Sequence, residues 1–411
     1  MITQEILTWP IIPHEYLYPK SIEDFLDAFE GILDLDIKAS GMELDFLIEG
    51  REASTKISPV LKLARPEDAK DLADICKKVY DNSYPYHEME DEKVIKKLIK
   101  DPHHHFILFK VGNYTAGCFR CAIDYEEKKG YMGGFMLRKQ FHGVVDVIKV
   151  IMGSYYWMWS TFKDDAVMWH CENRTAHAAL QHMTALCGID TVAIFPNKDI
   201  FYGLVESDVM GLIFNEKTLN NYRTKKVPAL IENALDPFLF ADNLYQLGFF
   251  QLVSPHLELN QEKINELRSM VNRKASKDKL GYEHFCLTLQ GTNSYFSFLH
   301  TPSVKNYEKV KYHVDSLEEF HVFIEEVRKC MDEQEIRYCE IFTSAHEPEY
   351  QQILYEFGFR ARGYVPCWEL DAKEQFYDDS LVFSFHEGEI EHIELLPQGR
   401  ELFSMVGLKV A

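Results

Sequence analysis

The stretch GYMGGFMLRKQFHGVVDVIKVIM, residues 130–152, decides the fold. Its first eight residues combine aromatic and aliphatic side chains with glycine and predict a β-strand. Farther along, apolar side chains recur every three or four residues, as at Val145, Ile148 and Met152, which predicts an amphipathic helix. Gly143 lies between the two patterns, and we expect the helix to begin there. The sequence thus predicts a strand, a glycine turn and a long helix in direct succession.

Strand and helix patterns alternate on both sides of this stretch. Upstream, residues 60–80 pass from a short apolar strand into a helix, and a hairpin is expected around Gly112. Downstream, the strand AVMWHCEN at residues 166–173 precedes a helix that ends at Gly188, and another strand follows. The predicted order of elements over residues 59–201 is βααβββαβαβ, which indicates an α/β fold.

Length and charge limit what this chain can be. Its 411 residues are enough for two domains, since single cores usually stop growing near about 250 to 300 residues. The formal net charge of −21 disfavours nucleic-acid binding, which depends on cationic neutralisation of phosphates. No apolar run is long enough to cross a membrane, and the first residues do not form a signal-peptide pattern. We therefore expect a cytoplasmic protein without a membrane association.

The order of elements and the residues at the glycine turn resemble the GNAT acetyltransferase superfamily. Its most diagnostic stretch has Gln or Arg, two further residues, Gly, one residue, and Gly or Ala. Here FMLRKQFHGVV offers Gln140, Gly143 and Val145 at the three key positions. The resemblance implies a mixed, mostly antiparallel sheet flanked by helices, which binds an acyl-coenzyme A, with acetyl-coenzyme A as the expected form. Val145 departs from the family pattern, and we expect its β-branched side chain to crowd the pyrophosphate.

The resemblance also implies which residues hold the cofactor. Backbone N–H groups at the start of a helix, helped by the helix dipole, can bind a pyrophosphate. Gly143 leaves room for that approach, and the basic side chains beside it are expected to add positive potential. An asparagine just after the junction strand anchors the cofactor arm in the family, and Asn173 matches it. The complete candidate set is Met136, Leu137, Arg138, Lys139, Gln140, His142, Gly143, Val144, Val145 and Asn173.

Transfer of an acyl group to an amine requires the amine to lose a proton, so a base is needed near the junction strand. Glu172 and His170 lie at the end of this strand, and because they alternate with Cys171 they can share one side of the sheet. Two other interpretations stay open, with Glu172 as a cap of the next helix and His170 as a hydrogen-bonded core residue. Thr184 stands where the family often has a tyrosine that protonates the leaving thiolate.

The second half of the chain resembles the family more faintly. YCEIFTSA and QILYEFGF repeat a junction strand and a helix, and Tyr355 precedes Gly358 by three residues. No loop with spaced glycines precedes that helix, so we expect a degenerate copy without a cofactor cradle, in which Tyr355 is either catalytic or a packed aromatic. The predicted domains are an N-terminal extension at 1–58, a GNAT-like acyl-coenzyme A domain at 59–215 and a degenerate GNAT-like domain at 216–411.

The favoured interpretation is an acyl-coenzyme A dependent N-acyltransferase that acts on a small-molecule or peptide amine. We expect no metal, because three consecutive histidines at 103–105 cannot readily converge on one ion, and His170, His177 and His182 lack the spacing of a same-face pair. One alternative is a non-catalytic GNAT-like protein that binds a ligand or a partner, which the departures from the family pattern would permit. Another is a tandem transferase that uses aminoacyl-tRNA, against which the acidic composition counts.

Overall fold

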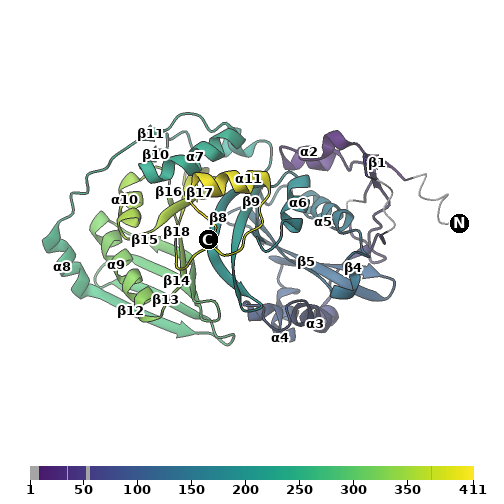
Figure 1. Ribbon diagram of the computed structural model, residues 1–411, viewed down its shortest axis with the longest axis horizontal. Helices are drawn as coiled ribbons and strands as arrows, with labels where there is room; N and C mark the ends of the chain where they lie inside the picture. Colours follow the sequence, from purple (N-terminus) through teal and green to yellow (C-terminus); the bar gives the residue numbers. More distant parts are fainter. Residues whose placement is uncertain (1–8, 35, 52–55, 372) are drawn as a thin grey trace. The chain divides into compact units, whose positions relative to one another are not determined.

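The computed structural model describes residues 9–34, 36–51, 56–371 and 373–411 (Figure 1). Within these ranges the chain forms two compact units, whose segments alternate along the sequence. Unit 1 consists of the described residues up to Asn173 together with Ala178–Asp190 and Gly211–Thr218. Unit 2 consists of Arg174–His177, Thr191–Met210 and Leu219–Ala411.

Unit 1 is built on a mixed arrangement of strands, five of which follow the order β3, β4, β5, β6, β7; Figure 1 labels β4 and β5. Neighbours from β3 to β6 are antiparallel, and β7 joins β6 in parallel. Helices and strands follow one another in the predicted order, and the predicted α/β class is confirmed. The strands are β3 (Val60–Leu63), β4 (His104–Val111), β5 (Tyr114–Asp124), β6 (Lys129–Leu137) and β7 (Met168–Arg174), and the helices are α3 (Ala69–Val79), α4 (Glu92–Leu98), α5 (Val147–Thr161) and α6 (Ala179–Leu186).

Helix α5 begins at Val147, so the prediction that it begins at Gly143 is wrong. The cause is a backbone contact from far upstream. The N–H of Ile57 donates to the carbonyl of Val144 at 2.8 Å, and the N–H of Asp146 donates to the carbonyl of Ile57 at 2.9 Å. These bonds hold the chain extended after the glycine, and helical spacing alone could not reveal them.

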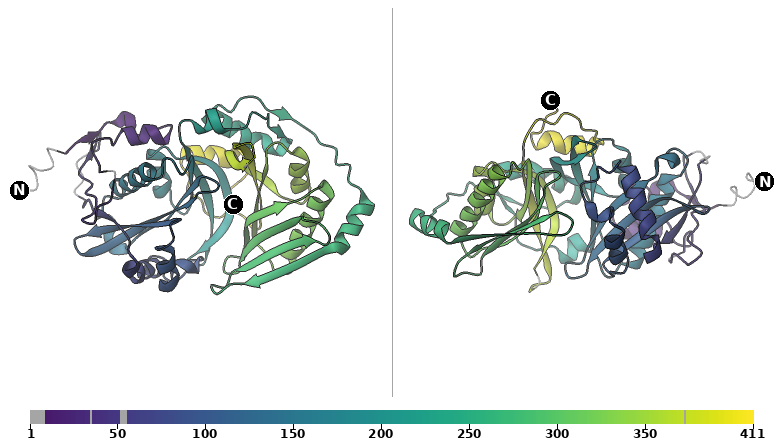
Figure 2. Two further views of the ribbon diagram at one scale, coloured as in Figure 1. Left: turned by 180° about the vertical axis from the view of Figure 1, so that it is seen from behind. Right: turned by 90° about the horizontal axis from the view of Figure 1, so that it is seen from below.

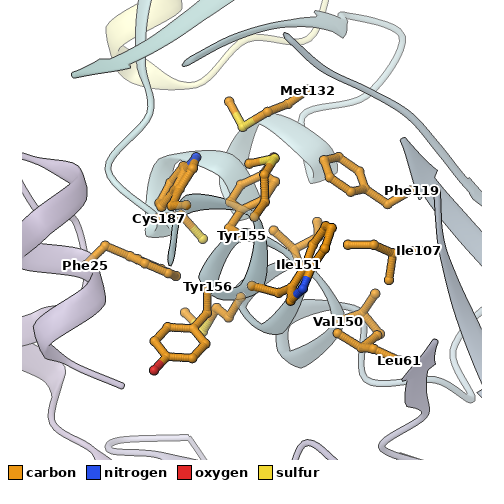
Figure 3. Close-up of a cluster of buried hydrophobic side chains, with 14 of the residues drawn as sticks. Phe25, Leu61, Ile107, Phe119, Met132, Val150, Ile151, Tyr155, Tyr156 and Cys187 are labelled. Carbon is orange, nitrogen blue, oxygen red and sulfur yellow. The ribbon is translucent and has the colours of Figure 1, made fainter. Parts of the chain in front are cut away.

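The aromatic side chains of α5 form the centre of the core of unit 1 (Figure 3). Phe25, from the N-terminal helix α2 (Ile22–Asp27), meets Trp159 edge-on with ring centroids 4.8 Å apart. Tyr155 packs against Phe119 of β5 at 5.5 Å, and Tyr156 is buried beside it. Burial of such large rings is the main source of stability in a core of this kind. The N-terminal segment is thus part of the core of unit 1.

Side chains of β6 and β7 alternate between the two faces of the sheet, as the period of a strand requires. Met132 and Cys171 are opposite each other and belong to the core shared with α5. Tyr131 and His170, the preceding pair, point to the other face and are only half-buried. That second face is the one that carries the candidate catalytic residues.

The parallel ladder between β6 and β7 is short. It runs over four residue pairs, from Lys129 and Met168 to Met132 and Cys171. Past Met132, β6 keeps its bonds to β5 through a bulge at which Gly134 adopts a φ of +63°. The two strands therefore separate at Glu172, and the rest of β6 has an edge that β7 does not pair.

Unit 2 contains strands in the order β12, β13, β14, β15, β16, β18, β17, β8, and Figure 2 shows the green strands of this unit from behind and from below. In it β15 and β16 are parallel neighbours, paired at Asn306 with Tyr338 and at Tyr307 with Cys339. Helices α8, α9 and α10 contribute to one buried cluster with these strands. The elements are β8 (Asp190–Phe201), β9 (Leu204–Phe214), α7 (Glu232–Tyr245), α8 (Gln261–Met270), β12 (Val271–Lys277), β13 (Glu283–Leu289), β14 (Tyr295–Thr301), β15 (Asn306–His313), α9 (Leu317–Glu333), β16 (Tyr338–Ser344), α10 (Pro348–Glu356), β17 (Arg360–Asp371), β18 (Phe376–His386) and α11 (Pro397–Met405).

Gly130 is required by the ladder, because a Cβ at this position would lie 2.1 Å from the ring of Trp169 on β7. We expect Gly130→Ala to lower the free energy of unfolding by about 1–3 kcal/mol through overpacking, measured by urea denaturation. The control is Gly399→Ala in α11, where the nearest atom, on Leu395, is 3.4 Å away. This change should be neutral or stabilising by up to about 1 kcal/mol, since alanine suits a helix better than glycine. Equal urea midpoints for the wild type and Gly130→Ala would contradict the packing argument.

Candidate functional site

The loop between β6 and α5 satisfies most of its own backbone N–H groups. Those of Phe141 and His142 donate to the carbonyls of Arg138 and Lys139, at 2.9 and 3.2 Å. The N–H groups of the next residues, other than Gly143, are also engaged: Val144 and Val145 donate to the carbonyl of Phe141, and Asp146 donates to Ile57. Five donors that face an anion in a typical glycine loop are therefore occupied within the chain.

From Gly143 to the first turn of α5, four N–H groups have no acceptor among the described residues. One belongs to Gly143, which is exposed, has a φ of +75°, and has no atom within 4 Å of the place of a Cβ. The others belong to the first turn of α5, at Val147, Ile148 and Lys149. Unpaired N–H groups at the start of a helix, together with a glycine that leaves space, suit a bound phosphate. This part of the predicted cradle fits an anionic group.

Val145 does not crowd this place, contrary to expectation. Its side chain is 1% exposed and belongs to the core shared with α5, whereas the neighbouring Val144 points outward and is 40% exposed. Met136 and Leu137, at the end of β6, are buried as well. The spacing of the motif fixed the position of the β-branched residue but gave no information about its direction.

The basic side chains of the loop already have acidic partners. Arg138 donates from Nη2 to Asp71 at 2.5 Å and from Nη1 to Asp74 at 2.7 Å, both on α3. Lys139 pairs with Asp81 at 2.7 Å on the surface. These pairs leave less positive potential at the loop than the sequence had indicated.

The remaining polar side chains of the loop are arranged less favourably for an anion. Nε2 of His142 lies 3.1 Å from the carbonyl oxygen of Leu137, and Gln140 is exposed. Asp146, the residue before α5, is a buried carboxylate. Lys149 turns away from the loop, since its Nζ donates to the carbonyl of Leu44 at 3.2 Å and lies 4.3 Å from the ring of Trp9.

Glu172 and His170 lie on the same half-buried face of β7, as the alternation predicted. The ring of His170 contacts that of Tyr131 at 5.2 Å between centroids. Helix α6 begins with Ala178 as its N-cap and has no side-chain cap, so the interpretation of Glu172 as a cap is wrong. His170 is half-buried and lies outside the buried core, so it is not a core histidine either.

Asn173 and Thr184 bond to each other in the interior. Nδ2 of Asn173 donates to Oγ1 of Thr184 at 3.2 Å, and that hydroxyl donates to the carbonyl of Gln181 at 3.0 Å. Burial raises the pKa of the Cys171 thiol to about 12, and the charge of Glu172 acts in the same direction. Cys171 is therefore a protonated core residue and not a nucleophile.

Sequence reasoning missed a group of tyrosines in unit 1. The connection between α3 and α4 carries Tyr80, Tyr84 and Tyr86, whose rings are neighbours, with centroid distances of 4.5 Å from Tyr80 to Tyr84 and 5.7 Å from Tyr84 to Tyr86. The stretch YDNSYPYHEME could have indicated this group, because three tyrosines are unusual in one short polar connection, and functional residues often lie on such connections.

Tyr355 lies in unit 2, on α10, and its side chain is 39% exposed. The guanidinium of Arg360 lies over its ring, 4.4 Å from the centroid. This contact makes Tyr355 a half-exposed stacking partner. It is not a packed core aromatic.

Two further features concern the described part of the chain as a whole. It contains no group of three or more His, Cys, Asp or Glu side chains arranged to hold a metal ion. In the same ranges, no helix is both long and apolar enough to cross a membrane.

Comparison with known proteins gives matches only among solved structures. No family model matches the chain, and no curated protein does. A spermidine N-acetyltransferase from Vibrio cholerae is 14% identical, covers 39% of this chain and 96% of its own, and has a TM-score of 0.33. The ribosomal α-N-protein acetyltransferase RimL, in complex with coenzyme A, is 14% identical, covers 40% of this chain and 97% of its own, and has a TM-score of 0.32. An acetyltransferase of the GNAT family from Streptococcus pneumoniae is 11% identical, covers 38% of this chain and 98% of its own, and has a TM-score of 0.33. The matched structures are thus GNAT acetyltransferases, the superfamily that the sequence resembles.

The ion pairs of Arg138 should stabilise unit 1, since its guanidinium is 14% exposed and bridges two carboxylates of α3. We expect Arg138→Met to lower the free energy of unfolding by about 1–3 kcal/mol, because it removes a partly buried, charge-assisted pair. Lys139→Met is the matched control, since its pair with Asp81 is more than half exposed and is worth at most about 1 kcal/mol. Urea denaturation at low and high salt measures both changes. A loss for Arg138→Met that is no larger than the loss for the control would contradict a stabilising role of the partly buried pair.

Proposed function

We propose that unit 1 is an N-acyltransferase that moves an acyl group from an acyl-coenzyme A to an amine. The observation that carries the proposal is the separation of β6 and β7 after Met132 and Cys171, which leaves Glu172 where the ladder ends. The glycine loop follows directly from the separated part of β6. Glu172 lies where the two strands separate, and the start of α5, which can hold an anion, follows the separated part of β6. This arrangement suits a phosphate-bearing acyl donor.

The residues of the loop would share the binding of the cofactor. The edge of β6 that β7 does not pair, near Met136 and Leu137, would suit the amide groups of a pantetheine arm, as an extended ligand adds to a strand edge. The N–H groups of Gly143 and of the first turn of α5 suit the pyrophosphate. Gln140 and His142, both exposed beside Gly143, would contact the outer phosphates. The remaining candidate residues would hold the loop in place through their contacts within the chain, and they are Arg138, Lys139, Val145 and Asn173.

The chemistry assigned to the site is direct transfer. The nitrogen of a neutral amine attacks the carbonyl carbon of the thioester, and Glu172 accepts the proton of that nitrogen, directly or through a water molecule. The C–S bond then breaks, and coenzyme A leaves as a thiolate, which is a tolerable anion because thiols have a pKa of about 8.5. Thr184 does not supply a proton in this scheme, since its hydroxyl donates to Gln181. His170 would orient Glu172 or the acceptor.

We also propose the tandem layout, with an N-terminal extension at 1–58, the acyl-coenzyme A domain at 59–215 and a degenerate copy at 216–411. Unit 2 supports this layout because its elements from β13 to β18 follow the order found from β4 to β9. Its parallel ladder ends at Tyr307 and Cys339, and Glu340 comes next, as Glu172 follows Cys171.

Two features favour catalysis in unit 1 over unit 2. Glu340 is buried and paired, because Lys198 lies 3.1 Å from it and the hydroxyl of Tyr338 donates to it at 2.8 Å. Helix α9 is capped by Ser316, which accepts from the N–H of Glu319, so its first turn has internal acceptors. Tyr355 is given no catalytic role in this proposal.

A non-catalytic GNAT-like binding protein is the second candidate. The engaged N–H groups of the loop, the buried carboxylate of Asp146 and the paired state of Arg138 all disfavour an anion there. The aminoacyl-tRNA alternative has no such support, and the net charge of −21 counts against it.

Acetyl-coenzyme A should bind at the glycine loop, and calorimetric titration measures this directly. We expect Gly143→Asp to weaken the affinity by at least about tenfold, since it places a negative charge beside the pyrophosphate. Gly112→Asp is the matched control, because Gly112 also has a positive φ, of +58°, and no atom within 4 Å of the place of a Cβ. It should bind like the wild type. No binding by the wild type would favour the non-catalytic alternative.

Glu172→Gln should lower kcat/KM for acetyl transfer by roughly a hundredfold or more, because the amide cannot accept a proton. Thiol release from acetyl-coenzyme A, with butylamine or 1,4-diaminobutane as acceptor, measures the rate. The dissociation constant of acetyl-coenzyme A should stay unchanged. His170→Gln serves as the comparison and should cost less than about tenfold. The reverse order of the two effects would assign the base to His170.

A further inference from the structure

Arg120, on β5, is a half-buried cation that has no carboxylate partner among the described residues. Its Nη1 donates to Sδ of Met89 at 3.7 Å, and its Nη2 lies 3.3 Å from Nδ1 of His104. Its Nε is buried without a hydrogen-bond partner in this part of the chain, and its Cζ lies 5.9 Å from the centroid of the Phe106 ring. A thioether and an aromatic ring are weak partners for a guanidinium, which binds a carboxylate far better. Arg120 therefore has donors for an anion that its neighbours do not provide.

The groups around Arg120 hold its side chain in place without neutralising its charge. Burial lowers the pKa of His104 to about 4, and the charge of Arg120 acts in the same direction, so the imidazole is neutral and accepts at Nδ1. Glu90, which follows Met89 in the chain, is directed to His87, with 3.7 Å between Oε2 and Nδ1. A partly buried cation without an anion is costly, and it suits a ligand that brings the opposite charge.

Arg120 lies beside the place where β6 leaves β7. It pairs with Gly133 in the antiparallel ladder of β5 and β6, so both residues face the same side of the sheet. Gly133 directly follows Met132, the last residue of β6 that pairs with β7. The Cβ of Arg120 lies 3.3 Å from the point where a Cβ of Gly134 would be. Gly134 belongs to the part of β6 that β7 does not pair.

Tyr131 connects this position to the strand of the proposed base. A Cβ at Gly133 would lie 2.8 Å from the hydroxyl oxygen of Tyr131, so the phenol lies over the residue that pairs with Arg120. The ring of Tyr131 contacts that of His170 at 5.2 Å between centroids, and the two residues pair in the parallel ladder. Glu172 is the next residue of β7 on this side of the sheet. A continuous series of contacts thus leads from Arg120, across β6, to the strand that carries Glu172.

We propose that Arg120 binds the carboxylate of a small amino acid whose amine is acylated at Glu172. A guanidinium can hold a carboxylate through two parallel hydrogen bonds, and the buried Nε supplies one of the two donors. Strands two places apart in a sheet lie about 10 Å from each other, so a short zwitterion can place its carboxylate at β5 and its amine at β7. A diamine would bring a second cation to Arg120, and a neutral group would leave the guanidinium unpaired. This inference rests on the proposed acyltransferase function and specifies its acceptor.

The first test compares amino acids with their own amides, with acetyl-coenzyme A as donor. Glycine, 3-aminopropanoate and 4-aminobutyrate differ in the distance between amine and carboxylate, and each amide keeps the length but lacks the charge. With rates expressed per neutral amine, we expect kcat/KM for the best amino acid to exceed that for its amide by about tenfold or more. Equal or higher rates for all three amides would overturn the proposal.

Variants of Arg120 test whether this residue makes the distinction. Arg120→Met should reduce the preference for the acid to less than about threefold, and Arg120→Lys should keep part of it, since lysine retains the charge but not the planar fork. The control is Arg273→Met in unit 2. Arg273 also lies against a ring, 5.3 Å from the centroid of Phe285, but it has a carboxylate partner in Glu333 at 2.6 Å, so the preference should stay complete. An undiminished preference in Arg120→Met would overturn the assignment to Arg120.

The second test needs no turnover and separates this inference from the proposed function. Calorimetry measures the binding of the three amino acids to the wild type, to Gly143→Asp and to Arg120→Met. We expect equal affinity for the wild type and Gly143→Asp, and at least about tenfold weaker binding for Arg120→Met. Amino-acid binding by a wild type that transfers no acetyl group would sink the transferase and keep the carboxylate site. Absence of binding of all three amino acids by the wild type would overturn the carboxylate site itself, whatever the enzyme assay gives.

Discussion

The short parallel ladder between β6 and β7 is the contact on which the rest of unit 1 depends. It exists because Gly130 leaves space for the ring of Trp169, so that two strands with large neighbours can approach at hydrogen-bonding distance. It ends after four pairs, and the bulge at Gly134 then keeps β6 with β5 instead of β7. The position of Glu172 and the free edge of β6 both follow from the place where this ladder stops.

The order of helices and strands could be predicted from the sequence because each element carries its own local period. The face of β7 that bears His170 and Glu172 was predictable for the same reason, since alternation along a strand needs no distant partner. The start of α5 was not, because Ile57, far upstream, holds the intervening residues extended. The inward direction of Val145 likewise depends on a core that assembles from many segments.

Charge at the site was the least predictable property. The sequence indicated that Arg138 is a free cation beside a glycine turn, but in the fold two carboxylates of α3 pair with it. The tyrosines of the α3–α4 connection show no strand or helix period, so only the folded chain reveals that their rings are neighbours. In unit 2, Lys198 meets Glu340 across a long stretch of chain, and no spacing rule could have related them. Local patterns thus specify elements, whereas the pairing of charges is a property of the assembled molecule.

The N-terminal segment has a practical consequence for anyone who wishes to isolate unit 1. Phe25 covers Trp159, Trp9 lies over Lys149, and Ile57 is bonded to the loop before α5. A fragment trimmed to the recognisable motif would expose the most aromatic helix of the molecule to solvent, and such surfaces associate nonspecifically. The smallest piece worth expressing is therefore longer than the stretch that family resemblance marks out, and its amino end must include the residues that look least like a domain.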